Sequence, residues 1–306
     1  MVKRILPERL KKGDSIGVVS ASDPLKDIEK DKQFYSGINF LKNMGFNVIL
    51  GENISSNEPE KRAKDINNFF MDKKIKAIIA SQGGDTSEKL LPFVDFNIIK
   101  KNPKIFLGIS DITVLLNAIN TKTGLITFHG NDVKYGFGRN PTEYDKTEFI
   151  RVLMDGSGGE TPANKERKTI RSGKAEGKLI GGNLYCLLKL IDTEYRPDFK
   201  ESILFLEDYD FEKEDCKSQL EKLKKIGVFD KIKGVIIGYI YGLQAINIGS
   251  KQMEEVLLEI TKNYSFPILK VNDFGHNTPN TVLPVGAIVE MDADKRKIKI
   301  VEKFIL

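Results

Sequence analysis

Ser110 stands where the sequence changes from a strand pattern to a helix pattern. Residues 105–107 form an apolar run of strand length, Gly108 follows, and residues 112–119 carry apolar side chains at helical spacing. A serine in such a turn can present its hydroxyl beside free backbone amides, as in a nucleophile elbow. The second glycine of that motif is an isoleucine here, and this stretch taken alone favours Ser110 and Asp111 as residues that cap the helix.

Glu207 and His276 could supply the other groups that an attacking serine requires. Glu207 follows a buried strand pattern, and His276 lies in a loop after another one. A hydroxyl attacks poorly unless a base takes its proton, and a carboxylate holds that base in the right tautomer. Strand ends commonly face a cleft. Taken singly, the histidine could be structural and the glutamate could simply meet solvent.

The elements that would position Ser110 alternate between strands and helices, which predicts an α/β fold with a parallel sheet covered on both faces. A loop with Gly83 and Gly84 follows the third strand and should share a rim with Ser110. Its glycines could direct amides toward an anion, although a turn capped by Asp85 is an equal alternative. The strand patterns of the first half cover residues 15–22, 47–50, 75–80, 105–107 and 125–129, and helix patterns cover 23–45, 58–71, a short stretch near 96, 112–119 and 142–154.

A change of composition over residues 155–176 marks the best domain boundary. We therefore divide the chain into an N-terminal domain, residues 1–160, and a C-terminal domain, residues 170–306. The second half repeats the alternation on a smaller scale and ends in a predicted hairpin. Residues 177–191 run from a strand pattern into an apolar helix pattern. Further strand patterns cover 202–208, 234–238, 266–271, 287–292 and 297–301, and further helix patterns cover 214–226 and 252–261.

Composition and charge exclude several classes of protein. Hydrophobic residues make up 40% and charged residues 30% of the 306 residues, as in ordinary soluble proteins. The net charge of +5 comes from lysines scattered among acids, so we expect no nucleic-acid partner. No apolar run reaches about 18 residues and no signal peptide is evident, so we expect a cytoplasmic protein without a membrane partner. Its two cysteines and two histidines form no metal-ligand cluster.

Several motifs together resemble the LD-carboxypeptidase family of serine peptidases, which includes murein tetrapeptide carboxypeptidases and microcin C immunity peptidases. They keep the family's order over nearly the whole chain. The matching segments are Gly83-Gly84, residues 102–113, 127–130, 181–184, 203–208 and 227–234, Phe274-Gly-His276, and residues 283–286.

The resemblance implies a catalytic triad in which Ser110 is the nucleophile, His276 the general base and Glu207 the group that orients the histidine. It also implies that the backbone amides of Gly84 and Asp111 hold the oxyanion. The implied fold is a Rossmann-like N-terminal domain with a smaller α/β C-terminal domain. A homodimer and the absence of any cofactor are implied as well.

The sequence also departs from the family pattern. The residue after Gly84 is usually apolar in relatives, whereas Asp85 could repel a carboxylate-bearing substrate. His129 occupies a position that varies, and we treat it as structural or substrate-adjacent. Gly83 and Asn183 are further candidates for residues next to the substrate.

The expected function is removal of the terminal D-alanine from murein tetrapeptide through an acyl-enzyme on Ser110. The alternative within the family is an immunity-type peptidase that cleaves aminoacyl-nucleotide antibiotics. Relatives of that kind stack an aromatic side chain of an inserted loop on the nucleobase, and residues 150–184 contain no Phe, Tyr or Trp. A non-catalytic two-domain peptide-binding protein would have no need of a triad. No arginine falls in a motif that would identify the residue for the substrate's carboxylate.

Overall fold

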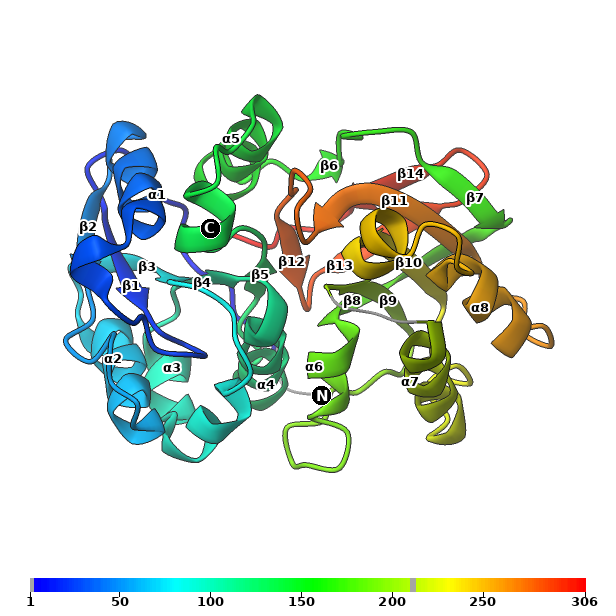
Figure 1. Cartoon of the computed structure of the whole chain (residues 1–306), viewed down its shortest axis with the longest axis horizontal. Coiled ribbons are helices and arrows are strands. Elements are labelled where there is room, and N and C mark those ends of the chain that lie inside the picture. The colour runs from blue at the N-terminus through cyan, green and yellow to red at the C-terminus, as the bar shows by residue number, and fades with distance from the viewer. Residues whose placement is uncertain (1–2, 210–212) are drawn as a thin grey trace.

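The structure is a computed structural model that describes residues 3–209 and 213–306, and this part of the chain folds around two sheets (Figure 1). The first sheet has the strand order β12-β5-β4-β3-β1-β2. Neighbours from β5 to β2 are parallel, as predicted from the alternation of strands and helices. The strands from the first half of the chain are β1 (Ser15–Val19), β2 (Asn47–Leu50), β3 (Ile75–Ala80), β4 (Ile105–Gly108) and β5 (Thr127–His129).

Helices cover both faces of the first sheet. Figure 1 shows α1 and α5 on one side and α2, α3 and α4 on the other. These helices are α1 (Lys32–Asn43), α2 (Pro59–Met71), α3 (Phe96–Lys101), α4 (Thr113–Thr123) and α5 (Glu143–Phe149). Short 3-10 or π turns are η1 (Ile28–Lys30), η2 (Ser87–Phe93), η3 (Ser110–Ile112), η4 (Val133–Phe137) and η5 (Ile150–Met154).

The first helix begins later than the predicted residue 23. Asp27 has a left-handed backbone, with φ 47°, which interrupts a helix. Asp31 then caps α1, because its carboxylate accepts a hydrogen bond from the amide of Phe34 at 2.9 Å. Asp23 and Pro24 therefore belong to a loop that follows β1 at the rim of the sheet, and not to the helix.

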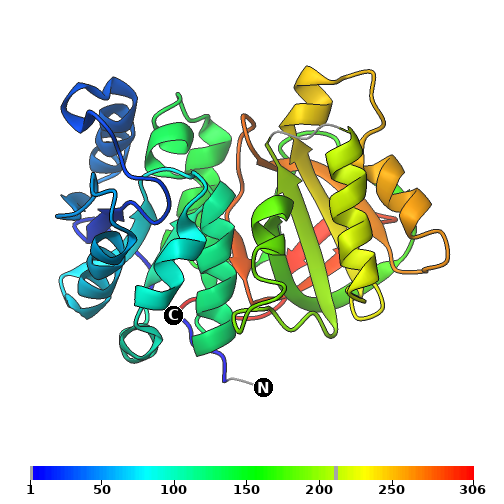
Figure 2. The ribbon, with the colours of Figure 1, turned by 60° about the horizontal axis from the view of Figure 1, so that its bottom comes forward.

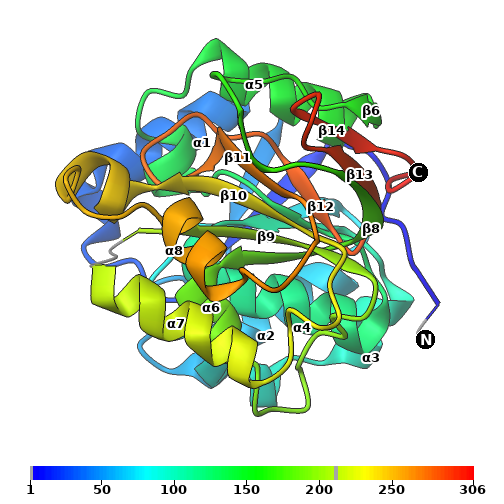
Figure 3. The same cartoon turned by 90° about the vertical axis from the view of Figure 1, so that its right-hand side faces the viewer.

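The second sheet has the order β6-β14-β13-β8-β9-β10-β11-β7, and β8 to β11 are parallel neighbours. The helices α6, α7 and α8 gather on one side of it (Figures 2 and 3). Its strands are β6 (Gly159–Glu160), β7 (Lys168–Arg171), β8 (Lys174–Asn183), β9 (Ser202–Asp208), β10 (Gly234–Ile240), β11 (Ile268–Gly275), β13 (Ile288–Asp292) and β14 (Lys297–Ile300). The remaining helical segments are α6 (Leu184–Leu188), α7 (Lys213–Lys225), η6 (Gly242–Ile246) and α8 (Met253–Ile260).

The two sheets are joined by a strand and by a shared core. β12 (Leu283–Val285) comes from the second half of the chain but pairs antiparallel with β5 of the first sheet. One apolar cluster runs from the first sheet to second-sheet residues such as Phe205 and Phe274. A separate cluster lies between the second sheet and α6, α7 and α8. The predicted terminal hairpin is confirmed as β13 and β14, whereas β6, β7 and β12 were not predicted.

Candidate active site

Ser110 lies in a strained turn between β4 and η3. Its φ is 64°, a left-handed conformation that non-glycine residues adopt rarely. Ile109 before it is still extended, so the chain turns sharply at Ser110. Neither η3 nor α4 has a side-chain cap, and the alternative in which Ser110 or Asp111 caps the helix is therefore wrong. The turn has the backbone strain that is typical of a nucleophile elbow.

Glu207 and His276 form a hydrogen-bonded pair at the carboxyl ends of second-sheet strands. Glu207 is fully buried near the end of β9, and His276 directly follows β11. His276 Nδ1 lies 2.6 Å from Glu207 Oε2, and 17% of the histidine side chain remains exposed. The contact fixes the orientation of the ring and leaves Nε2 as the nitrogen for another partner.

The pair shifts the pKa of both groups. Burial alone would raise the pKa of Glu207, but the charge of His276 and its hydrogen bond hold that pKa below its ordinary value. Burial alone would lower the pKa of His276, but the charge and hydrogen bond of Glu207 raise it above its ordinary value. Glu207 therefore strengthens His276 as a proton acceptor.

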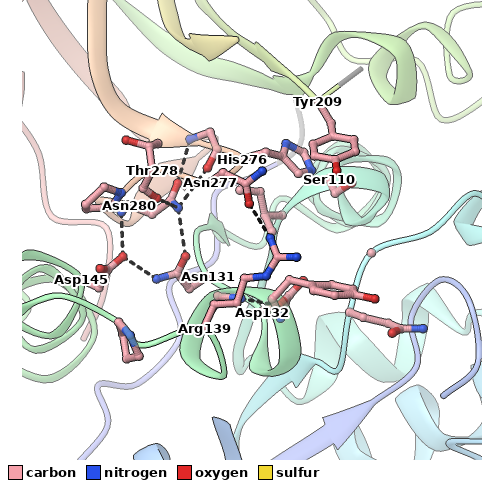
Figure 4. Close-up of a pocket in the computed structure, with 18 of the residues that line it drawn as sticks. Ser110, Asn131, Asp132, Arg139, Asp145, Tyr209, His276, Asn277, Thr278 and Asn280 are labelled. Carbon is pink, nitrogen blue, oxygen red and sulfur yellow. Dashed lines mark hydrogen bonds between the residues drawn. The ribbon is translucent and has the colours of Figure 1, made fainter. Parts of the chain in front are cut away.

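A cavity of about 740 Å³ brings Ser110 and His276 together from the two halves of the chain (Figure 4). Ser110 enters it from the end of β4 and His276 from the end of β11, while the buried Glu207 lies behind the histidine. Tyr209 also lines the cavity, with its ring centroid 5.0 Å from that of His276.

The loop with Gly83 and Gly84 contacts the Ser110 turn. A Cβ added to Gly83 would come within 2.9 Å of Ser110 Oγ and 3.8 Å of the Asp111 amide nitrogen. Gly84 has φ 147°, and a Cβ there would collide with Asp23. Both positions therefore need glycine for the loop to lie beside the serine. The two segments share a rim, as the order of the strands predicted.

A buried carboxylate anchors the residue after Ser110. Asp111 is fully buried, and its Oδ2 accepts hydrogen bonds from Ser22 Oγ at 2.5 Å and the Ser87 amide at 2.7 Å. Its Oδ1 accepts from Lys189 Nζ at 2.8 Å. Burial alone would raise the pKa of Asp111, but the hydrogen bonds from Lys189 and Ser22 and the charge of Lys189 hold it below its ordinary value. Lys189 follows α6, so a cation from the second half of the chain reaches this turn.

Asp85 belongs to the same network and does not line the cavity. Its carboxylate pairs with Lys189 Nζ, and 69% of its side chain is exposed. Its amide donates to Asp23 Oδ1 at 3.2 Å. The charge that the sequence placed next to the candidate oxyanion site is therefore compensated by a lysine outside the cavity.

His129 and Asn183 also lie outside the cavity lining. His129 is fully buried, neither ring nitrogen has a hydrogen-bond partner, and its ring packs edge-on against Phe205 and Phe274. Burial lowers the pKa of His129 to about 4, so the imidazole is neutral at physiological pH. Asn183 is buried and caps α6, because its side chain accepts a hydrogen bond from the Cys186 amide at 3.1 Å.

The cavity wall contains residues that the sequence did not identify. Arg139, Tyr135 and Tyr209 line it, as do Asp132 and Asp145. The loop after β5 that supplies Tyr135 and Arg139 is rich in glycine and has no clear periodicity, so only its position after a first-sheet strand could have drawn attention to it.

Two exclusions apply to the part of the chain that the structure describes. No group of His, Cys, Asp and Glu side chains there is suited to hold a metal ion. None of its helices combines the length and the apolar character needed to cross a membrane.

The chain is similar to known proteins over nearly its whole length. Models of the LD-carboxypeptidase N-terminal and C-terminal domains match residues 16–130 and 176–291. The microcin C7 self-immunity protein MccF of Escherichia coli is 33% identical, over 98% of this chain and 97% of the relative. A probable murein peptide carboxypeptidase of Bacillus subtilis is 29% identical, over 95% and 92% of the two chains. A structure of MccF with glutamyl sulfamoyl guanosine superimposes with a TM-score of 0.89 at 31% identity, covering 98% of this chain and 99% of the other.

The fold and the family matches thus define a serine peptidase. The chain belongs to the LD-carboxypeptidase family, as its motifs suggested, and it has the mixed α/β fold of that family's solved members.

Proposed function

We propose that this protein is a serine carboxypeptidase that cleaves the L,D-peptide bond to the terminal D-alanine of murein tetrapeptide. The observation that carries the proposal is the cavity shared by Ser110 and His276, with His276 bonded to the buried Glu207. A strained serine, a histidine with a raised pKa and a buried carboxylate are the parts that acyl transfer requires.

In the proposed reaction, Ser110 Oγ attacks the scissile carbonyl carbon while His276 Nε2 takes the hydroxyl proton. Glu207 holds the ring in place and stabilises the imidazolium that forms. The amides of Gly84 and Asp111 would stabilise the oxyanion. His276 then gives the proton to the departing amine of D-alanine, and a water activated by the same histidine hydrolyses the acyl-enzyme.

The family name and the murein peptide carboxypeptidase of Bacillus subtilis support this choice of substrate. We further propose that the protein acts in peptidoglycan recycling in the cytoplasm, as a homodimer, with domains over residues 1–160 and 170–306. Sedimentation equilibrium of the purified chain tests the dimer.

A second candidate function is cleavage of aminoacyl-nucleotide antibiotics. The chain has no tryptophan, and residues 150–184 have no aromatic side chain. However, the exposed rings of Tyr135 and Tyr209 line the cavity and could stack on a base. The structure of the relative MccF with glutamyl sulfamoyl guanosine supports this alternative.

Mass spectrometry of products from the wild type and Ser110→Ala tests both functions. The substrates are L-Ala-D-Glu-mDap-D-Ala and, in parallel, an aminoacyl sulfamoyl adenosine. We expect the wild type to release D-alanine and Ser110→Ala to lose on the order of 10⁶-fold in kcat. Cleavage of the adenosine compound alone would favour the second function, and cleavage of neither would favour a binding protein. Undiminished turnover by Ser110→Ala would overturn the triad.

A further inference from the structure

Arg139 supplies the positive charge of the cavity wall. Among the described residues that line the cavity, no other arginine and no lysine occurs. Arg139 Nη1 donates to Asn277 Oδ1 at 2.5 Å, and the guanidinium carbon lies 5.2 Å from the ring centroid of Tyr135. Asn277 directly follows His276, so this contact anchors the guanidinium near the candidate base (Figure 4).

The carboxylates of the cavity wall are occupied by other donors. Asp132 Oδ1 accepts hydrogen bonds from the amides of Tyr135 and Gly136, at 2.7 and 2.9 Å. The carboxylates of Asp23 and Asp145 also accept hydrogen bonds from donors other than Arg139. The donors are Thr86 Oγ1 and the Asp85 amide for Asp23, and Asn131 Nδ2, the Asn280 amide, the Thr142 amide and Thr142 Oγ1 for Asp145.

Arg139 has no ion pair with any described residue. A guanidinium carries five N–H donors in a planar fork, and the contacts of Arg139 are a neutral amide and the face of an aromatic ring. An arginine held in this way keeps its full charge and most of its donors for a ligand. The group that best matches the fork is a carboxylate, which can accept two parallel hydrogen bonds.

We propose that Arg139 binds a carboxylate of the substrate and so makes the enzyme selective for acidic peptides. The inference rests on the proposed peptidase function and adds the residue that reads the substrate's charge. Asp85 does not oppose this role, because its carboxylate is paired with Lys189 outside the cavity. Murein tetrapeptide has three free carboxylates, on D-glutamate, on diaminopimelate and on the terminal D-alanine, and the proposal assigns one of them to the arginine.

Equilibrium binding to the Ser110→Ala protein tests the proposal without turnover. The ligands are L-Ala-D-Glu-mDap-D-Ala and three variants of it, each with one carboxylate amidated: on D-glutamate, on diaminopimelate or at the C-terminus. Calorimetry is repeated with Arg139→Gln and Arg139→Lys in the same background. The matched control is Arg296→Gln, because Arg296 is an arginine outside the cavity that pairs with Glu166 at 3.2 Å.

We expect one of the three amidations to weaken binding by about 10- to 100-fold, the usual effect of losing a charged hydrogen bond. Arg139→Gln should bind the acid as weakly as that amide, Arg139→Lys should recover part of the difference, and Arg296→Gln should behave as the parent. If Arg139→Gln still distinguishes the acid from all three amides, the inference fails while the proposed function stands. If the parent binds none of the peptides and the wild type cleaves none, both fail.

Discussion

Lys189 Nζ lies 2.8 Å from Asp111 Oδ1, so a cation from the second half of the chain binds the residue that follows Ser110. The same nitrogen pairs with Asp85, the residue that follows Gly84. One lysine is thus bonded to both segments whose amides would hold the oxyanion. Its contacts connect the two halves of the protein directly at the candidate site.

Replacing Lys189 with methionine should lower both stability and turnover. The carboxylate of Asp111 would stay buried without its cation, which costs about 3 kcal/mol, the low end for breaking a buried pair. Lys122→Met is the control, because Lys122 and Glu194 form a surface pair, with side chains 32% and 69% exposed, that is worth about 1 kcal/mol or less. Urea unfolding measures both variants. Equal, small losses of unfolding free energy would contradict the role of Lys189.

Replacing Glu207 with glutamine should change the pH dependence of turnover. The base must be neutral, so kcat/KM of the wild type rises as the pH increases through the raised pKa of His276. Without the charge of Glu207 this rise should move to lower pH, and the plateau should fall by about 10⁴-fold. The measurement is kcat/KM from pH 5 to 9. An unmoved profile would show that Glu207 does not set the pKa of the base.

Replacing Gly83 with alanine should block the nucleophile and leave the fold intact. The new Cβ would lie 2.8 Å from Ser110 Cβ and 2.9 Å from Ser110 Oγ, and Gly83 does not have a left-handed backbone. We expect a large loss of kcat and, because the two Cβ atoms cannot both keep their places, a loss of about 1–3 kcal/mol in unfolding free energy, measured with urea. Gly249→Ala, where a Cβ would meet nothing within 4 Å, is the control. If Gly83→Ala were acylated as fast as the wild type, the loop would have to move away from the serine.

Replacing His129 with leucine should preserve turnover. In the wild type, burying the two unpaired imidazole nitrogens costs about 1–3 kcal/mol, and the substitution removes this penalty. It also removes aromatic contacts that stabilise the fold by about 0.5–1.5 kcal/mol. Unfolding free energy should stay level or rise. A loss of kcat greater than about tenfold in a folded variant would assign His129 a part in the reaction.

The sequence could predict most of the fold because the first sheet is built from local alternation. The strands over residues 47–50, 75–80 and 202–208 have the predicted bounds, since each is a short apolar run next to a turn. β12 could not be found in this way. It is a short segment with a proline, and its pairing with β5 depends on a distant part of the chain.

The candidate site was predictable to the extent that its residues stand at strand ends. Ser110, Glu207 and His276 each follow or close a strand, so the order of the strands brings them to one region. Lys189 and Arg139 carry no such signal. Lys189 follows an apolar helix and Arg139 lies in a loop, and their importance arises from partners far away in the sequence.

The position of β12 also has a consequence for synthesis on the ribosome. β5 remains an edge strand until residues 283–285 have been made, because β12 is its outer neighbour in the first sheet. His276 precedes β12 in the chain, so it has already been translated when that strand becomes available. A nascent chain that is long enough to complete the sheet carrying Ser110 therefore already contains the candidate base. A prematurely ended product that lacks His276 also lacks β12, so β5 stays unpaired on one side.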